Sequence, residues 1–484
     1  MQEHFDVVIV GAGISGIGAA HYLKRDCPDR SFAILEGRDD IGGTWDLFRY
    51  PGIRSDSDMH TLGFSFKPWI AEASIADGPA ILDYLREAVD ESDLQGKIRF
   101  GHQVSAAAWD SEAGHWTLSV VRAGERISLT CNFLYMCSGY YSYRKGHVVD
   151  FPGQESFAGQ IIHPQQWPED LDYSGKKVVI IGSGATAVTL VPAMAKEAAH
   201  VTMLQRSPSY MASAPSRDPI NGWLRKLLPQ RWAYGLTRAK NILFQDRMYR
   251  ATRTRPEQVK KLLLDRVRNE LGEDYDVETH FTPKYNPWDQ RLCLVPDSDL
   301  FRSLRSGQAS VVTDGIRSFR ENGIELDSGD FLEADIIVTA TGLQMAMLGE
   351  AEFSVDGEPV DFSQVWTYKG VAYSDVPNLV STFGYINASW TLRVDLNCAF
   401  VCRVLNHMRE TGTNRFTPRL RPEDAGMAER PWIEDFPSGY MKRGMHLMPR
   451  QGDRTPWVNT QRYFTDKKLM SEPLLEDGTL HFEA

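Results

Sequence analysis

Two glycine-rich loops constrain the fold of this chain more than any other feature of its sequence. GAGISG occupies residues 11–16 and GSGATA occupies residues 182–187. Each loop follows a short apolar run typical of a buried parallel strand, and each opens a segment of small residues that favours a helix. Such a strand–loop–helix unit binds the pyrophosphate of a dinucleotide at the helix N-terminus. We therefore predict an α/β chain with two Rossmann-like dinucleotide-binding domains.

The first loop has the features of a site for FAD or NAD. Gly11 permits the tight turn, Gly13 lets the backbone approach a pyrophosphate, and Gly16 allows close packing of helix on strand. Ser15 in the same loop is also expected to contact the cofactor. The next strand, SFAILE, ends at Glu36, which can accept hydrogen bonds from ribose hydroxyls. Because this acid would repel a 2′-phosphate, we do not expect NADP here.

The second loop differs at the position that selects the cofactor. Its glycines are Gly182 and Gly184, and Ala187 replaces the third glycine, which the fingerprint tolerates. The following strand, HVTMLQRS, ends in Arg206 and Ser207 instead of an acid. A guanidinium and a hydroxyl suit a 2′-phosphate, so we predict NADPH at this site; the alternative is an arginine that simply points into solvent. Further predicted cofactor contacts of this loop are Ser183, Ala185 and Thr186.

The segments around the two loops carry a resemblance to a known family. Residues 157–168 read FAGQIIHPQQWP, a Phe-x-Gly-x-x-x-His-x-x-x-Trp-Pro pattern, and residues 42–56 read GGTWDLFRYPGIRSD. With the two loops, these segments resemble type I Baeyer–Villiger monooxygenases, which are class B flavoprotein monooxygenases. The segments at 286–296, 384–395 and 451–457 resemble the branch that includes the ethionamide-activating monooxygenases. The resemblance covers nearly the whole chain.

The resemblance implies an oxygenase with two cofactors, FAD and NADPH. Enzymes of this family insert one atom of dioxygen beside a ketone carbonyl, through a flavin peroxide, and form an ester or a lactone. We expect a small apolar ketone or thioether as substrate. The same branch also oxygenates sulfur, so a flavin monooxygenase that acts mainly on thioamides, sulfides or amines stays open as the alternative.

The resemblance also implies which residues contact the flavin. Gly43, Thr44, Trp45 and Asp46 would line it, Arg54, Ser55 and Asp56 would lie where flavin and nicotinamide meet, and Val104 would contact the adenine through its backbone. In the family a lysine often precedes the active-site arginine and helps to bind the 2′-phosphate. Gln290 takes that place here, so the strictness of the choice of NADPH over NADH stays open.

Arg291 is the predicted catalytic residue, because the resemblance places it at the flavin edge. The reaction develops negative charge on oxygen, and a fixed cation stabilises such charge where water is excluded. Arginine suits this task since it keeps its proton. Asp56 would pair with Arg291 and aim it. The structural alternative is an ion pair of Arg291 with Asp289 or Asp297. We interpret His163 as a linker residue that ties the two domains together, not as a general base.

Strands that end in small-residue turns predict where the chain crosses between the domains. We expect an FAD-binding domain at 1–148 and an NADP-binding domain at 149–344, with a helical insertion at 210–285. Residues 345–484 are expected to return to the FAD domain and to form a region near the substrate.

The insertion is basic in an otherwise acidic chain. Residues 221–270 contain 13 Lys or Arg and 4 Asp or Glu, whereas the whole chain has a net charge of −11. Pro256 and Gly272 are typical of the two ends of a helix. Its expected apolar stripe is Val259, Leu262, Leu263, Leu264, Val267 and Leu271. The charge fits a solvated helix face, a patch that steers NADPH, or a peripheral contact with a membrane surface.

Composition excludes several other classes of protein. The acidic net charge argues against nucleic-acid binding. The six cysteines form no disulfide framework and include no early Cys-x4-Cys pair of the kind that disulfide reductases need. We find no signal peptide, no membrane span and no metal-ligand pattern, and we predict a cytoplasmic enzyme. A nucleotide-binding redox sensor without turnover is the non-enzymatic alternative. The oligomeric state and the natural substrate do not follow from the sequence.

Overall fold

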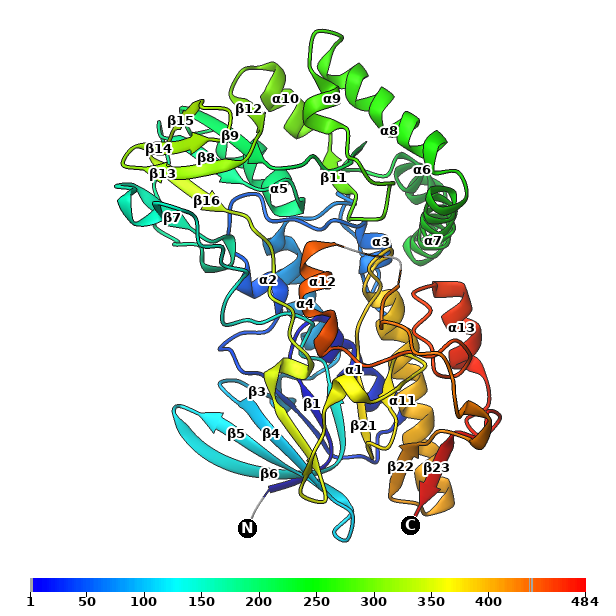
Figure 1. Ribbon diagram of the computed structural model, residues 1–484. Helices are drawn as coiled ribbons and strands as arrows, with labels where there is room; N and C mark the ends of the chain where they lie inside the picture. The colour runs from blue at the N-terminus through cyan, green and yellow to red at the C-terminus, as the bar shows by residue number, and fades with distance from the viewer. Residues whose placement is uncertain (1–2, 435, 437) are drawn as a thin grey trace.

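Two separate sheets organise the chain, one around each glycine-rich loop (Figure 1). The computed structural model describes residues 3–434, 436 and 438–484. Strands from the first and last thirds of the sequence meet in the first sheet, whereas the middle of the sequence builds the second sheet. The predicted fold class, α/β with two Rossmann-like units, is confirmed by this arrangement.

Five parallel strands form the core of the first sheet. Their order is β3–β2–β1–β6–β21. The strands are β1 (Glu3–Val10), β2 (Phe32–Leu35), β3 (Ile98–Arg99), β6 (Glu125–Met136) and β21 (Leu379–Ser381). Val7 and Ile9 of β1 are fully buried in the same apolar cluster as residues of α1 (Ile14–Asp26) and α11 (Thr391–Thr411). Helices therefore cover this face of the sheet, which explains the continuous apolar run of β1.

An antiparallel extension covers the other face of the same strands. It consists of β4 (Gln103–Asp110), β5 (His115–Arg122), β17 (Glu352–Val355) and β18 (Glu358–Pro359). Val8 of β1 packs in one cluster with Trp109 of β4 and Trp116 of β5, all of them buried. The late strands β17 and β21 thus join a sheet that the N-terminal residues began. The domain limits themselves stay a prediction.

The second sheet is entirely parallel, with the order β12–β9–β8–β16–β7. Its strands are β7 (Gln160–Ile162), β8 (Lys177–Ile181), β9 (His200–Gln205), β12 (Ala309–Thr313) and β16 (Ile336–Thr339). The helices α5 (Ala185–Met194) and α10 (Asp299–Arg305) pack against each other beside this sheet. A small antiparallel sheet follows in the chain, with β13 (Ile316–Arg320), β14 (Gly323–Leu326) and β15 (Phe331–Glu333).

The helical insertion lies at the outer edge of the second unit (Figure 1). Its elements are β10 (Met211–Ala214), α6 (Pro219–Leu227), α7 (Gln230–Thr254), α8 (Pro256–Leu271) and α9 (Val277–Phe281). Helix α8 begins at Pro256 and ends just before Gly272, as the sequence predicts. The predicted apolar stripe is wrong at Leu262, whose side chain is exposed, because α8 buries only the face that carries Val259, Leu263 and Val267.

The remaining described elements complete the region around the first sheet. They are α2 (Thr44–Leu47), α3 (Met59–Leu62), α4 (Gly78–Glu91), β11 (Cys293–Pro296), β19 (Thr367–Tyr368), β20 (Ala372–Tyr373), β22 (Arg415–Pro418), α12 (Gly439–Gly444), α13 (Tyr463–Ser471) and β23 (Leu480–Glu483). In the part of the chain that the structure describes, no helix combines the length and the apolar character needed to cross a bilayer.

Candidate functional site

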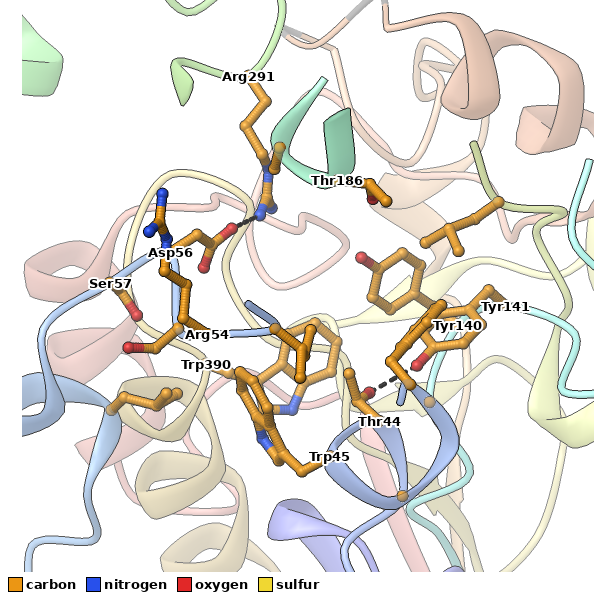
Figure 2. A pocket seen from close by; sticks show the side chains of 18 of the residues that line it. Thr44, Trp45, Arg54, Asp56, Ser57, Tyr140, Tyr141, Thr186, Arg291 and Trp390 are labelled. Atoms are coloured by element: carbon orange, nitrogen blue, oxygen red, sulfur yellow. Dashed lines mark hydrogen bonds and ion pairs between the residues drawn. The ribbon is translucent and has the colours of Figure 1, made fainter. Parts of the chain in front are cut away.

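A cavity of about 420 Å³ lies between the two glycine-rich loops. The first loop and the segments after it contribute Gly13, Ile14, Ser15, Gly43, Thr44, Trp45, Arg54, Ser55 and Asp56 to its wall. The second loop and its helix contribute Ala185, Thr186 and Thr189. Side chains from both halves of the molecule face this one space (Figure 2). The predicted residues of the two cofactor sites therefore meet at a single cavity.

The first loop has the backbone geometry that a pyrophosphate needs. Gly11 has φ +105°, and a Cβ there would lie 2.6 Å from the carbonyl oxygen of Cys137. A Cβ on Gly16 would overlap the carbonyl oxygen of Gly11, so helix α1 can start this close to β1 only with glycine. Gly13 begins α1 without a side-chain cap, which leaves the first N–H groups of the helix available to an anion.

Glu36 lies buried behind the first loop, with 6% of its surface exposed. Its carboxylate accepts hydrogen bonds from the backbone N–H of Ala12 at 2.7 Å and of Arg38 at 2.9 Å. Burial raises the pKa of Glu36, and the two N–H donors oppose this effect only in part. A carboxylate has more than two lone pairs, so the group can still accept hydrogen bonds from ribose hydroxyls.

The residues after the second strand divide into cavity wall and support. Thr44 and Trp45 line the cavity, and the Thr44 hydroxyl lies 2.6 Å from the hydroxyl of Tyr141. Among the described residues, Asp46 is not part of the cavity wall. Its buried carboxylate instead pairs with Arg38 at 2.6 Å and with Arg49. Asp46 therefore holds the loop in place, and the expectation that it lines the flavin receives no support from its orientation.

Val104 and Ser55 are both buried at predicted cofactor positions. Val104 lies in β4, and its carbonyl oxygen accepts a hydrogen bond from the side chain of Gln103 at 3.3 Å. Ser55 exchanges hydrogen bonds with the backbone of Ala76 while it lines the cavity. The neighbouring Arg54 forms an ion pair with Asp299 of α10. This ion pair joins the segment after the first strands to a helix of the second unit.

The second loop repeats the geometry of the first one with more open space. Gly182 has φ +141°, and a Cβ there would lie 2.6 Å from the carbonyl oxygen of Ala340. Gly184 has no heavy atom within 4 Å of its Cβ position, and it begins α5 without a side-chain cap. Ala187 is completely buried against the strands. A phosphate can therefore approach the backbone of this loop from the open side.

The cationic end of the following strand is free to bind an anion. Arg206 and Ser207 are exposed, and in the described part of the chain no hydrogen bond or ion pair holds the Arg206 guanidinium. The carbonyl oxygen of Ser207 accepts a hydrogen bond from the Ser183 hydroxyl at 2.9 Å, which fixes this turn beside the loop. The chemistry of these donors fits a phosphate on the ribose.

Arg291 and Asp56 form an ion pair on the cavity wall although 235 residues separate them in the chain. Figure 2 shows the two side chains pointing toward one another. They are 32% and 45% exposed, so the cavity can still reach both groups. The Asp56 carboxylate raises the pKa of Arg291, which keeps the guanidinium charged.

The structural alternative for Arg291 does not occur in the described structure. The Asp289 carboxylate pairs with Arg253 at 2.8 Å. The Asp297 carboxylate accepts the backbone N–H of Ser216 at 2.9 Å. Both acids are thus engaged elsewhere, and Asp56 is the ion-pair partner of Arg291.

The comparisons with known proteins agree with this geometry. The model of the family described as flavin-binding monooxygenase-like matches residues 73–408, and that of the NAD(P)-binding Rossmann-like domain matches residues 9–73. The first match covers more than half of the chain. The chain belongs to the flavin-binding monooxygenase-like family. The expectation of FAD and NADP as cofactors agrees with this assignment.

Relatives and solved structures extend this result over the full length of the monooxygenase. FAD-containing monooxygenase EthA of Mycolicibacterium smegmatis is 52% identical over 483 residues, which cover 100% of this chain and 98% of EthA. An oxidized steroid monooxygenase bound to NADP has a TM-score of 0.80 at 22% identity, with 99% of both chains covered. An open crystal structure of cyclohexanone monooxygenase has a TM-score of 0.79 at 20% identity, with 100% of both chains covered. The two solved structures share the fold.

Aromatic residues of the monooxygenase complete the cavity, and motif reasoning did not assign them. Tyr140 and Tyr141 follow the turn at the end of β6 and line the cavity. Trp390 donates a hydrogen bond from its indole nitrogen to the Ser15 hydroxyl at 2.8 Å, and its ring stacks on Tyr140 at 5.4 Å between centroids. The signal for the tyrosines was their place directly after a small-residue turn at a strand end.

His163 of the monooxygenase lies where the linking segment meets the cavity. It lines the cavity and accepts a hydrogen bond from the backbone N–H of Gln165 at 3.2 Å. A Cβ on Gly146 would overlap its ring, so the imidazole packs directly on the chain that crosses between the units. Burial lowers the pKa of His163. This contact is in keeping with a linker role.

Proposed function

We propose that this flavin monooxygenase uses FAD and NADPH to insert one oxygen atom of dioxygen beside a ketone carbonyl, with an ester or a lactone as product. The observation that carries the proposal is the Arg291–Asp56 ion pair on the wall of a cavity shared by two dinucleotide loops. Dioxygen and a small apolar ketone are the expected substrates.

Each half of the protein would hold one cofactor. Gly13 and Gly16 shape the loop for the pyrophosphate of FAD, and Glu36 would accept the hydroxyls of its ribose. Gly184 gives NADPH an open approach to the start of α5, and Arg206 would bind its 2′-phosphate. The nicotinamide and the flavin would then meet near Thr186 and Asp56, which line the same cavity.

Arg291 would act on the charge that develops during oxygen transfer. Bound FAD, once reduced by NADPH, supplies the activated oxygen. The guanidinium stabilises negative charge on the reacting oxygen atoms, and it does so without reorganisation because Asp56 already aims it. Since its pKa is raised, Arg291 keeps its charge throughout the working pH range.

The rest of the cavity wall suits an apolar substrate. Trp45, Trp390 and Tyr140 present aromatic surface close to the ion pair (Figure 2). Such a wall holds a ketone by burial of its carbon chain and excludes water from the charged groups, which strengthens their interactions.

Oxygenation of sulfur is the second candidate function. Its support is the identity of 52% with EthA over the full chain, since the ethionamide-activating branch is associated with thioamides and sulfides. The same activated oxygen can pass to a soft nucleophile such as a thioether sulfur. In that case Arg291 would matter less, because no negative charge develops on a carbonyl oxygen.

Product analysis separates the two functions. The purified protein, loaded with FAD, is given NADPH and a mixed panel of linear, cyclic and aryl ketones and thioethers, and the products are identified by mass spectrometry. We expect esters or lactones from ketones. Sulfoxides or N-oxides alone would contradict the ketone assignment and support the second candidate.

A variant of Arg291 tests the residue that carries the proposal. Arg291→Ala should still be reduced by NADPH, yet form ester about 10²–10³ times more slowly, because it lacks the only aimed cation at the ion pair. Arg317→Ala is the matched control, since Arg317 pairs with Glu325 at 3.2 Å in the small antiparallel sheet. Ester formation at the wild-type rate in Arg291→Ala would remove this residue from the mechanism.

A further inference from the structure

Helix α6 presents an unusual face to solvent. Ile220, Trp223 and Leu227 recur at spacings of three and four residues, so they share one side of the helix. Their exposed fractions are 51%, 61% and 60%. A helix of a water-soluble protein normally buries such a stripe and points polar residues outward. The outward stripe of α6 thus has no cover in the described structure.

Helix α7 continues this apolar face and also has a conventional buried side. Its outer side carries Trp232, Leu236 and Leu243, which are 69%, 49% and 43% exposed. Its inner side is polar and bonded to the rest of the protein: Arg238 donates to the carbonyl oxygen of Gly63 at 2.7 Å. The helix is therefore firmly anchored, and its outer apolar residues are not the result of a misplaced segment.

Basic side chains surround these apolar residues. Arg225, Lys226, Arg231 and Arg247 are exposed, and within the described residues no ion pair or hydrogen bond holds any of them. The region 221–270 has a formal charge of +9, from 13 Lys or Arg and 4 Asp or Glu, in a chain with a net charge of −11. The apolar face thus coincides with the one strongly basic stretch that the sequence analysis identified.

We propose that the outer face of α6 and α7, with Trp223 and Trp232 at its centre, docks on the surface of an anionic lipid bilayer. Amphipathic helices with apolar aromatic residues on one face and Lys or Arg beside them bind in the plane of the bilayer interface. Tryptophan is enriched at that interface, and each nearby basic residue is attracted to anionic headgroups. This proposal goes beyond the oxygenase function and does not depend on it.

The other readings of this surface account for less of it. A solvated basic face or a patch that steers NADPH needs charge but gives no reason for exposed tryptophans. A symmetric dimer through this face would bring two regions of charge +9 against each other, which like-charge repulsion opposes. Only an anionic, partly apolar surface complements both features.

The docking face and the substrate cavity share one helix. On the inner side of α7, Asn241 and Gln245 donate hydrogen bonds to the Asp58 carboxylate at 2.8 and 2.9 Å, and Gln245 lines the cavity. The bilayer surface would therefore lie one helix away from the cavity wall. An apolar substrate dissolved in the bilayer would have a short path to the site.

Vesicle flotation with the full-length protein tests the proposal. Vesicles of equimolar phosphatidylcholine and phosphatidylglycerol are compared with phosphatidylcholine alone, at low and high salt. We expect the protein to float with the anionic vesicles at low salt and to be released at high salt. In Trp223→Ser/Trp232→Ser, binding should fall about tenfold or more because the apolar anchors are lost. Leu475→Ser/Phe331→Ser is the matched control, since Leu475 and Phe331 are exposed at 57% and 42% on other elements.

A charge variant separates the basic residues from the tryptophans. Arg225→Gln/Lys226→Gln/Arg231→Gln should lose the preference for anionic vesicles, while circular dichroism and thermal melting stay as in the wild type. The proposal is overturned if the wild type does not float with anionic vesicles at low salt, or if the tryptophan variant floats as the wild type does. It is also overturned if sedimentation shows a dimer that the tryptophan variant converts to a monomer and vesicle binding is absent.

Discussion

The two glycine-rich loops share one backbone plan and differ in what stands behind them. Behind the first loop, Glu36 is buried and bonded to two backbone N–H groups. Behind the second loop, Arg206 is exposed, and no partner holds its guanidinium among the described residues. Gly16 leaves no room for a methyl group, whereas Ala187 carries one at the same place in the second unit. We interpret the first site as built for a cofactor that stays and the second site as built for one that is exchanged at each turnover.

The largest effect that would test this contrast is expected at Gly16. In Gly16→Ala the new methyl group meets the Gly11 carbonyl oxygen, so helix and strand must separate, at a cost of about 3 kcal/mol or more. Flavin absorbance of the purified protein and its thermal unfolding measure the loss. Ala187→Gly is the control and should cost only about 0.5–1 kcal/mol. Equal effects of the two substitutions would break the comparison.

The next largest effect is expected at Glu36. Glu36→Ala leaves the buried N–H groups of Ala12 and Arg38 without their acceptor, which costs about 1–3 kcal/mol for each unpaired donor. The variant should lose stability and bound flavin together, as measured by thermal melting and by the flavin-to-protein absorbance ratio. Full flavin content with unchanged melting would show that this acid does not organise the first site.

Arg206 should behave in the opposite way. Arg206→Gln removes an exposed cation, so melting temperature and flavin content should stay constant. The KM for NADPH should rise about 10- to 100-fold, as expected for a charge-assisted contact with phosphate, while the KM for NADH changes little. An equal rise for both cofactors would mean that the 2′-phosphate is not bound here.

The smallest expected effect is a dependence of stability on pH that resides in Glu36. Its pKa is raised in the folded protein, so the folded state holds this proton more tightly than the unfolded state does. The contribution is fully present below the unfolded pKa and is lost as pH rises through the folded value. In flavin-free protein, the melting difference between wild type and Glu36→Ala should therefore shrink as pH rises from the acidic range to neutral. A difference that grows with pH would contradict the raised pKa.

Local motifs carried most of the fold that could be predicted. The two loops, the acid after the first one and the end signals of α8 are short-range patterns, and the fold class and that helix are confirmed. The orientation of Asp46 was not accessible, because Arg38 and Arg49 compete for its carboxylate only once the loop is folded. Leu262 belongs to an apolar stripe by spacing, but spacing does not tell how wide the covered face is.

The cavity shows what sequence distance hides. Arg291 and Asp56 could be paired in advance only through the family resemblance, since 235 residues lie between them, and their roles stay a prediction. The Trp390–Ser15 hydrogen bond joins residues 375 positions apart, and no local pattern announces it. The outward apolar face of α6 and α7 is equally invisible in a periodicity, because the same stripe predicts a buried helix as readily as an exposed one.

The ion pair at the cavity has one more implication, which concerns when the protein is competent. Asp56 comes from the segment that follows the strands of the first unit, and Arg291 comes from the chain beside the second unit. Neither half owns the complete pair. The aimed cation exists only while the two lobes are seated together, so any event that parts them also disarms the chemistry.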